Sequence, residues 1–106
     1  MIIFTVQSKL DKNVRLTKTQ WDHITFRHSE LIEQSEKVIE VLQEPDIVLY
    51  SEMEDNYQYY KYYFKTPVGP KHLLVIVRHL NGDGFLITAF FIRNIRTKNK
   101  ENVYER

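Results

Sequence analysis

The spacing of apolar and polar positions divides the chain into helical and extended segments. Thr17 and Gln20, three residues apart, form a capping box that predicts a first helix beginning at about Lys18. Apolar residues then recur at helical spacing between about 31 and 43, which predicts a second helix with its glutamates facing water. Pro45 ends this helix, because the residue before a proline is disfavoured in the helical region.

The rest of the pattern predicts strands. Residues 2–6 form a short apolar run, and the polar stretch that follows, up to Asn13, is predicted as a loop or hairpin return. Beyond Pro45, turn residues separate four runs rich in apolar and aromatic residues, and these predict strands at 47–50, 57–65, 73–80 and 85–93. The predicted fold is therefore α+β, with two N-terminal helices packed on a four-stranded antiparallel meander sheet.

Length and composition predict one domain. The 106 residues suffice for one hydrophobic core and are too few for two, so we expect a single domain over 1–106. Its core should span about 14–93, and residues 94–106 should form a loosely held polar tail with a short helix near 103–104. There is no cysteine, which excludes disulfides and thiolate metal sites. No membrane-length apolar run and no basic leader are present, so we expect a cytoplasmic protein without a membrane partner.

Charge is balanced overall but unevenly distributed. The 15 basic and 14 acidic residues give a net charge of +1, so no overall basic field indicates nucleic-acid binding. Residues 30–55 are strongly acidic, with Lys37 as the only basic residue, whereas residues 61–100 are predominantly basic. The second half of the chain could therefore attract a polyanion locally.

The first predicted helix carries the strongest candidate chemistry. His23 and Arg27 are four residues apart and share a face, so an imidazole that can move a proton lies beside a guanidinium that can hold negative charge. This pair is suited to binding and cleaving a phosphate diester. The alternative is that both side chains belong to an ordinary solvated helix surface without a function. His28 lies on a second face with Trp21 and Ile24, and we expect it to be buried with one ring nitrogen hydrogen-bonded.

The strands add further candidates. Thr88 interrupts an apolar strand, and its hydroxyl needs a partner if buried, although a β-branched residue in a strand needs no special explanation. Pairing Leu80 with Phe85 would place Thr88 on the same face as Leu86. The tyrosines of 57–65 could stack on exposed bases or could be half-buried strand formers, and the face that includes Tyr59 is predicted to be wet.

Metal and cofactor binding are not predicted. His23 and His28 point to different faces of the helix, and neither has a carboxylate at ligand spacing. His72 and His79 are predicted to point to opposite faces of a strand. The chain also has no glycine-rich phosphate loop.

Three segments together resemble a known family. They are Arg15-Leu16-Thr17 leading to Trp21-Asp22-His23-Ile24 and Arg27-His28-Ser29-Glu30-Leu31, then Glu44-Pro45-Asp46, and finally Leu74-Val75-Ile76-Val77 followed by Leu86-Ile87-Thr88-Ala89-Phe90. Over roughly residues 14–93 the chain resembles small phage- and mobile-element-associated proteins of the barnase/EndoU/colicin/RelE-type ribonuclease fold. Ser29 stands where proline is common in that family.

The resemblance implies a metal-independent, toxin-like RNA endonuclease. His23 matches the family's helix histidine, Arg27 its arginine and Thr88 its strand alcohol. Tyr59, Tyr60 and Lys61 match an aromatic-basic strand that would contact RNA. In the reaction itself, Arg27 or Lys61 would stabilise the phosphorane. Because the reaction needs both an acid and a base, His28 or His79 could supply a second proton-transfer group.

A binding module of the same fold, without catalysis, is the alternative. Its acidic second helix could mimic nucleic acid or dock on a basic partner of antitoxin or immunity type, and its aromatic strand could pair with a second copy to form a homodimer.

Overall fold

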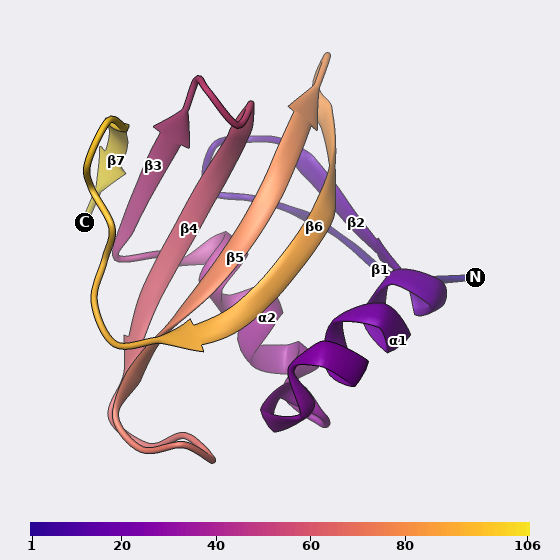
Figure 1. The fold of residues 1–106 in the computed structure, drawn as a ribbon. Helices are drawn as coiled ribbons and strands as arrows, with labels where there is room; N and C mark the ends of the chain where they lie inside the picture. Colours follow the sequence, from indigo (N-terminus) through magenta and orange to yellow (C-terminus); the bar gives the residue numbers. More distant parts are fainter.

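A single curled sheet of seven strands forms most of the computed structural model of residues 1–106 (Figure 1). The strand order in space is β1-β2-β6-β5-β4-β3-β7. In chain order, the elements are β1 (Ile2–Gln7), β2 (Asn13–Thr17), α1 (Lys18–Arg27), the 3₁₀ turn η1 (Ser29–Leu31), α2 (Ser35–Gln43), β3 (Ile47–Ser51), β4 (Asn56–Tyr63), β5 (Lys71–Leu80), β6 (Asp83–Ile92) and β7 (Glu101–Glu105).

The predicted architecture of two N-terminal helices on a four-stranded meander is wrong. Two strands precede α1, and the sheet is mixed because β2 pairs with β6 in parallel. The predicted loop or hairpin return up to Asn13 is the connection to β2, an unpredicted strand antiparallel to β1, and the predicted loose tail with a short helix contains β7, antiparallel to β3. Both strands are five residues long, and β7 consists largely of exposed polar side chains. β7 becomes a strand because its backbone pairs with β3, and side-chain alternation does not record that pairing.

The helices begin and end close to their predicted bounds, with one difference. The first helix begins at Lys18, as the capping box predicts. The second begins at Ser35 instead of about 31, because residues 29–31 form the 3₁₀ turn and Glu33 adopts a left-handed φ of 66°. Ile32 is consequently exposed and does not face the core.

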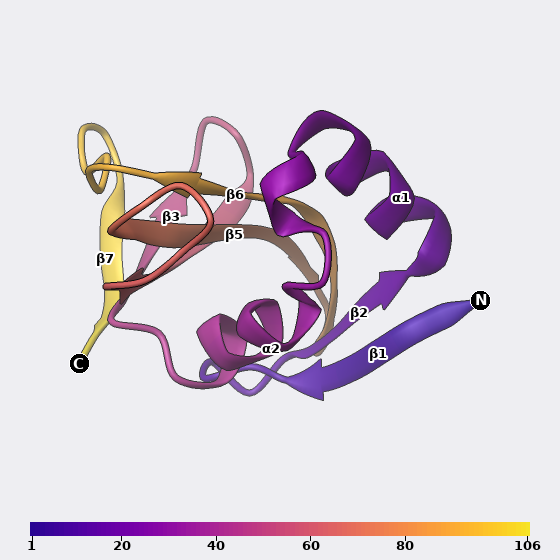
Figure 2. The same ribbon diagram turned by 90° about the horizontal axis from the view of Figure 1, so that it is seen from below.

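The sheet curls around α2, so the main core lies on its concave face. Figure 2 shows α2 between the β1–β2 pair and the central strands. Val38, Val41 and Leu42 of α2 are fully buried there, in the same cluster as Val75 and Val77 of β5. The opposite face carries a smaller cluster, where Ile95, from the segment after β6, packs against Ile47, Leu49, Tyr60 and Leu74. Neither α1 nor α2 has the length and apolar character needed to cross a membrane.

A β-bulge in β6 determines which residues reach each face. The hairpin pairs Leu80 with Asp83, not with Phe85 as predicted. Val77 pairs with Leu86, but its neighbour Ile76 pairs with Thr88, which leaves Ile87 as an extra, unpaired residue. Beyond the bulge the alternation is inverted, so Thr88 does not share a face with Leu86. Instead it lies on the side of the second cluster, with Phe90 two residues further on.

Candidate active site between α1 and β6

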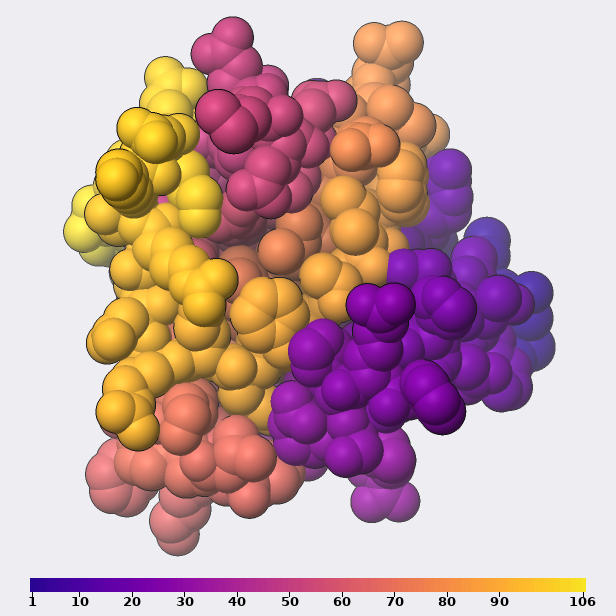
Figure 3. All heavy atoms as spheres, in the orientation of Figure 1, coloured from indigo at the N-terminus to yellow at the C-terminus, as the bar shows by residue number.

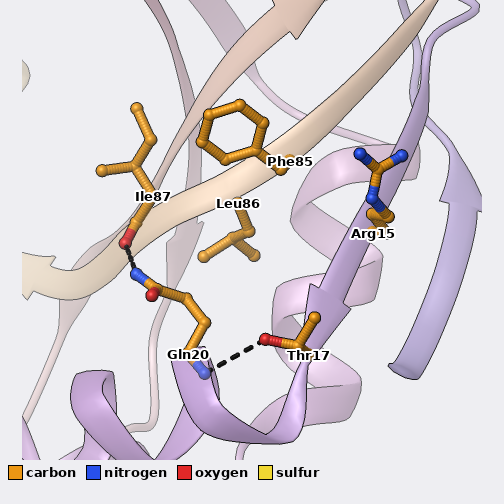
Figure 4. A pocket seen from close by; sticks show the side chains of 6 residues that line it. All are labelled: Arg15, Thr17, Gln20, Phe85, Leu86 and Ile87. Carbon is orange, nitrogen blue, oxygen red and sulfur yellow. Dashed lines mark hydrogen bonds between the residues drawn. The ribbon is translucent and has the colours of Figure 1, made fainter. Parts of the chain in front are cut away.

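The N-terminus of α1 is fixed by two contacts from one glutamine. The backbone N–H of Gln20 donates to Thr17 Oγ1 at 3.2 Å, which is the predicted cap. Its side chain does not return to Thr17, as a complete capping box would require; Nε2 donates instead to the carbonyl of Ile87 (Figure 4). That carbonyl belongs to the bulge, and β2 pairs with β6 only through residues 13–15 and 83–85. Gln20 therefore takes the place of a strand partner and attaches α1 to β6.

The attached helix brings the predicted catalytic residues together. His23, Arg27 and His28 line a pocket of about 360 Å³ with Thr88 and Phe90 of β6. Gln20, Ile24 and Ile87 complete its lining. Figure 3 shows α1 lying directly against β6 on this face of the molecule. Residues about 60 positions apart in the sequence thus share one pocket.

The candidate catalytic side chains are not engaged within the protein. His23 and Arg27 are exposed and Thr88 is half-buried. None of the three side chains makes a hydrogen bond, and neither His23 nor Arg27 forms an ion pair. Their donors and acceptors are therefore available to a ligand in the pocket.

His28 is held more firmly than His23, although it is less buried than predicted. Its ring stacks on Phe90, with centroids 5.2 Å apart and planes inclined by 27°. Nδ1 lies 3.8 Å from Glu30 Oε1, which is too long for the hydrogen bond expected with a carboxylate. The side chain keeps 31% of its surface exposed. His28 therefore forms a wall of the pocket and remains open to a ligand.

The predicted aromatic platform for RNA is wrong. Tyr59 and Tyr60 are both 0% exposed and belong to the clusters on opposite faces of the sheet. The Tyr59 hydroxyl donates to Ser8 Oγ at 2.8 Å, and burial raises the pKa of Tyr59 to about 12. The Tyr60 hydroxyl accepts from the backbone N–H of Arg96 at 3.3 Å. These rings therefore stabilise the core and cannot stack on bases.

Lys61 and His79 also lie outside the pocket. Lys61 Nζ donates to the Glu44 carbonyl at 2.9 Å, which ties β4 to the end of α2. His79 stacks on Tyr57 with centroids 3.9 Å apart, and its Nε2 lies 3.1 Å from the Tyr59 hydroxyl. Burial, and secondly the nearby charge of Lys12, lowers the pKa of His79 to about 4. Both side chains hold the fold together at positions away from α1.

Sequence reasoning missed a second pocket beside the first. It measures about 220 Å³ and is lined by Arg15, Thr17, Gln20, Phe85, Leu86 and Ile87 (Figure 4). Its Arg15 lies on β2, which was not predicted as a strand, and Gln20 was interpreted only as a cap. The available signal was the basic residue two positions before a helix cap. No acidic residue lines either pocket.

No group of three or more histidine, aspartate, glutamate or cysteine side chains is placed to hold a metal ion. Comparisons with protein-family models, with curated proteins and with solved structures found no match.

Proposed function

We propose that this protein is an RNA endonuclease that cleaves by transphosphorylation with acid–base side chains. The observation that supports this most directly is the meeting of His23, Arg27 and Thr88 in one pocket without an acidic residue. A phosphodiester is anionic and gains further negative charge at its non-bridging oxygens in the transition state, so a cationic pocket with a free imidazole suits it.

The proposed reaction requires two proton transfers. The ribose 2′-oxygen attacks the adjacent phosphorus, and the bond from phosphorus to the 5′-oxygen of the next nucleotide breaks, leaving a 2′,3′-cyclic phosphate. One imidazole accepts the proton of the 2′-hydroxyl and another donates a proton to the departing 5′-oxygen. His23 and His28 are the two histidines of the pocket. Arg27 stabilises the charge on the phosphorane, and the Thr88 hydroxyl donates to a phosphate oxygen.

The family resemblance supports the same assignment. The helix histidine, the arginine and the strand alcohol of that family correspond to His23, Arg27 and Thr88. These three residues line one pocket. Because cellular RNA is the proposed substrate, the cytoplasm is the proposed place of action. A toxin-like enzyme of this kind would act under the control of an antitoxin or immunity-type partner.

The test is to incubate the purified protein with single-stranded RNA in excess chelator. We expect products that end in 2′,3′-cyclic phosphate, and no cleavage of DNA, which lacks the 2′-hydroxyl. His23→Ala should lower the rate about 100-fold or more, the usual contribution of a general acid or base. Arg27→Ala should cost on the order of 100-fold, and Thr88→Val less.

His79→Gln is the matched control, because this histidine lies outside the pocket. Its activity should equal that of the unsubstituted protein at a pH where both are folded. Intact RNA under all conditions, or cleavage unaffected by His23→Ala, would contradict the proposal. RNA that is bound but not cleaved would favour the non-catalytic binding module.

A further inference from the structure

The two pockets beside β6 are neighbours. Gln20 and Ile87 line both, and the hydrogen bond between them lies where the pockets meet. The second pocket exists because β2 pairs with β6 for three residues only and then leads into α1, so the two strands separate beside Phe85. A chain molecule bound at His23 and Thr88 would therefore reach the second pocket by passing over the contact between Gln20 and Ile87.

Arg15 gives the second pocket a positive charge that nothing in the protein neutralises. The residue is half-buried, and its side chain makes no ion pair and no hydrogen bond. Two other arginines differ, because Arg78 lies 3.8 Å from Asp55 and Arg106 lies 3.5 Å from Asp46. A partly desolvated guanidinium without a carboxylate is suited to an anionic ligand, and phosphate matches its planar array of donors.

The rest of the second pocket is largely apolar. Figure 4 shows Phe85 on β6 and Arg15 on β2 toward one end, with Gln20 and Thr17 toward the other. Phe85 is half-exposed, so its ring can be reached by a ligand. The volume of about 220 Å³ lies below the ~300–1,000 Å³ typical of sites for drug-sized ligands, so a single base with its phosphate is a better fit.

We propose that this second pocket binds a third nucleotide of single-stranded RNA, adjacent to the two nucleotides that the scissile phosphate joins. Arg15 binds the phosphate of that nucleotide and Phe85 contacts its base. Aromatic rings combined with cationic side chains are the usual means of holding single strands, and a base reaches such a ring only when it is unpaired. The inference rests on the proposed function, because it takes the neighbouring pocket as the place of the scissile phosphate.

The experiment compares short RNAs that fill one or both pockets. A dinucleotide should occupy the pocket of His23, whereas a trinucleotide extended on the correct side should also reach Arg15. Binding is measured by fluorescence anisotropy with 2′-O-methyl oligonucleotides, which cannot undergo transphosphorylation, and cleavage with the unmodified RNAs. Trinucleotides extended at the 5′ end and at the 3′ end are both used.

We expect one of the two trinucleotides to bind more tightly than the dinucleotide. Arg15→Ala should weaken binding of that trinucleotide about tenfold and leave the dinucleotide unchanged, because a charge-assisted contact is lost only in the extended complex. Phe85→Leu should show the same length dependence, and Arg15→Lys should retain part of the affinity. Lys98→Ala removes an exposed charge elsewhere and should change neither affinity. A urea unfolding curve shows whether each variant is folded. If Arg15→Ala is not folded, Arg15→Gln takes its place.

The outcomes separate this inference from the proposed function. If Arg15→Ala affects all three RNAs equally, or none of them, the second pocket is not a nucleotide site, even where cleavage is observed. If no RNA is cleaved but the length-dependent loss in Arg15→Ala remains, the site stands and the nuclease proposal fails. If no oligonucleotide is bound or cleaved, both fail.

Discussion

His23 and His28 differ in what their side chains contact, although they line the same pocket. The His23 ring has no partner in the protein, whereas the His28 ring stacks on Phe90 and lies near Glu30. His28→Ala should therefore lower the free energy of unfolding by about 1–3 kcal/mol, through the lost stacking and a less well filled wall. His23→Ala should change it by less than about 0.5 kcal/mol, as is usual for surface substitutions.

Urea unfolding at neutral pH, monitored by tryptophan fluorescence, measures both effects. Trp21 lies on α1 and reports on the helix that carries both histidines. A large loss of stability in His23→Ala with none in His28→Ala would reverse the assignment and make His28 the principal candidate for proton transfer.

The residues of the candidate site were predictable where local geometry determines them. Helical spacing places His23 and Arg27 on one face of α1 whatever α1 packs against. Tyr59 and Tyr60 were not predictable in this way, because alternation shows that two residues face opposite sides of a strand but not that both sides are covered. Here α2 covers one face, and the segment containing Ile95 packs on the other. Both tyrosines are therefore buried.

Among the elements, β7 protects a strongly apolar strand. It pairs with β3, whose Ile47, Val48 and Leu49 are buried, and the backbone N–H of Arg106 also donates to the Asp46 carbonyl at 2.9 Å. Removing residues 101–106 would make β3 an exposed edge strand, and such edges pair with other chains. We expect the shortened protein to self-associate and to lose about 2 kcal/mol or more of stability through its missing backbone hydrogen bonds.

Light scattering coupled to size-exclusion chromatography, together with urea unfolding, tests this expectation. Val103→Ala is the matched control, because it alters an exposed side chain and leaves the backbone pairing of β7 in place. A shortened chain that stays monomeric and as stable as the complete one would show that β7 contributes little to the fold.

The elements that could be predicted from the sequence are determined by residues close together in the chain. The start of α1 depends on Thr17 and Gln20, which are neighbours in the chain, and the β5–β6 turn depends on a glycine-containing loop in which Gly82 has a φ of +89°. The parallel pairing of β2 with β6 joins residues about 70 positions apart. No local pattern encodes that pairing, so the mixed character of the sheet was missed. The strand β2 itself carried a local signal, because Val14 and Leu16 alternate with polar residues, but the run is only five residues long.

The stability of the whole molecule should depend on pH through His79. Folding lowers the pKa of this histidine from its ordinary 6.5 to about 4. Between these values the unfolded chain takes up a proton that the folded chain does not, so stability is complete above pH 6.5 and declines as the pH falls toward 4. The loss should be on the order of 1–2 kcal/mol, after allowing for the partial exposure of the ring.

Urea unfolding between pH 7.5 and 4, compared with His79→Gln, isolates this contribution from that of the carboxylates. The stability advantage of the unsubstituted protein over His79→Gln should shrink as the pH falls through the window, and His23→Gln should keep the original pH dependence. An advantage that is constant or grows toward acid pH would mean that folding does not disfavour the charged imidazole.

The bulge at Ile87 makes the site depend on chain length as well as on residue identity. Deleting this one residue would join Leu86 directly to Thr88, so ordinary alternation would keep Thr88 on the side of the pocket, but the bulge would be lost. Loss of the unpaired carbonyl would also leave Gln20 without its acceptor on β6. In divergent descendants of this chain, the number of residues between the hairpin and the threonine should therefore be inherited as strictly as the threonine itself.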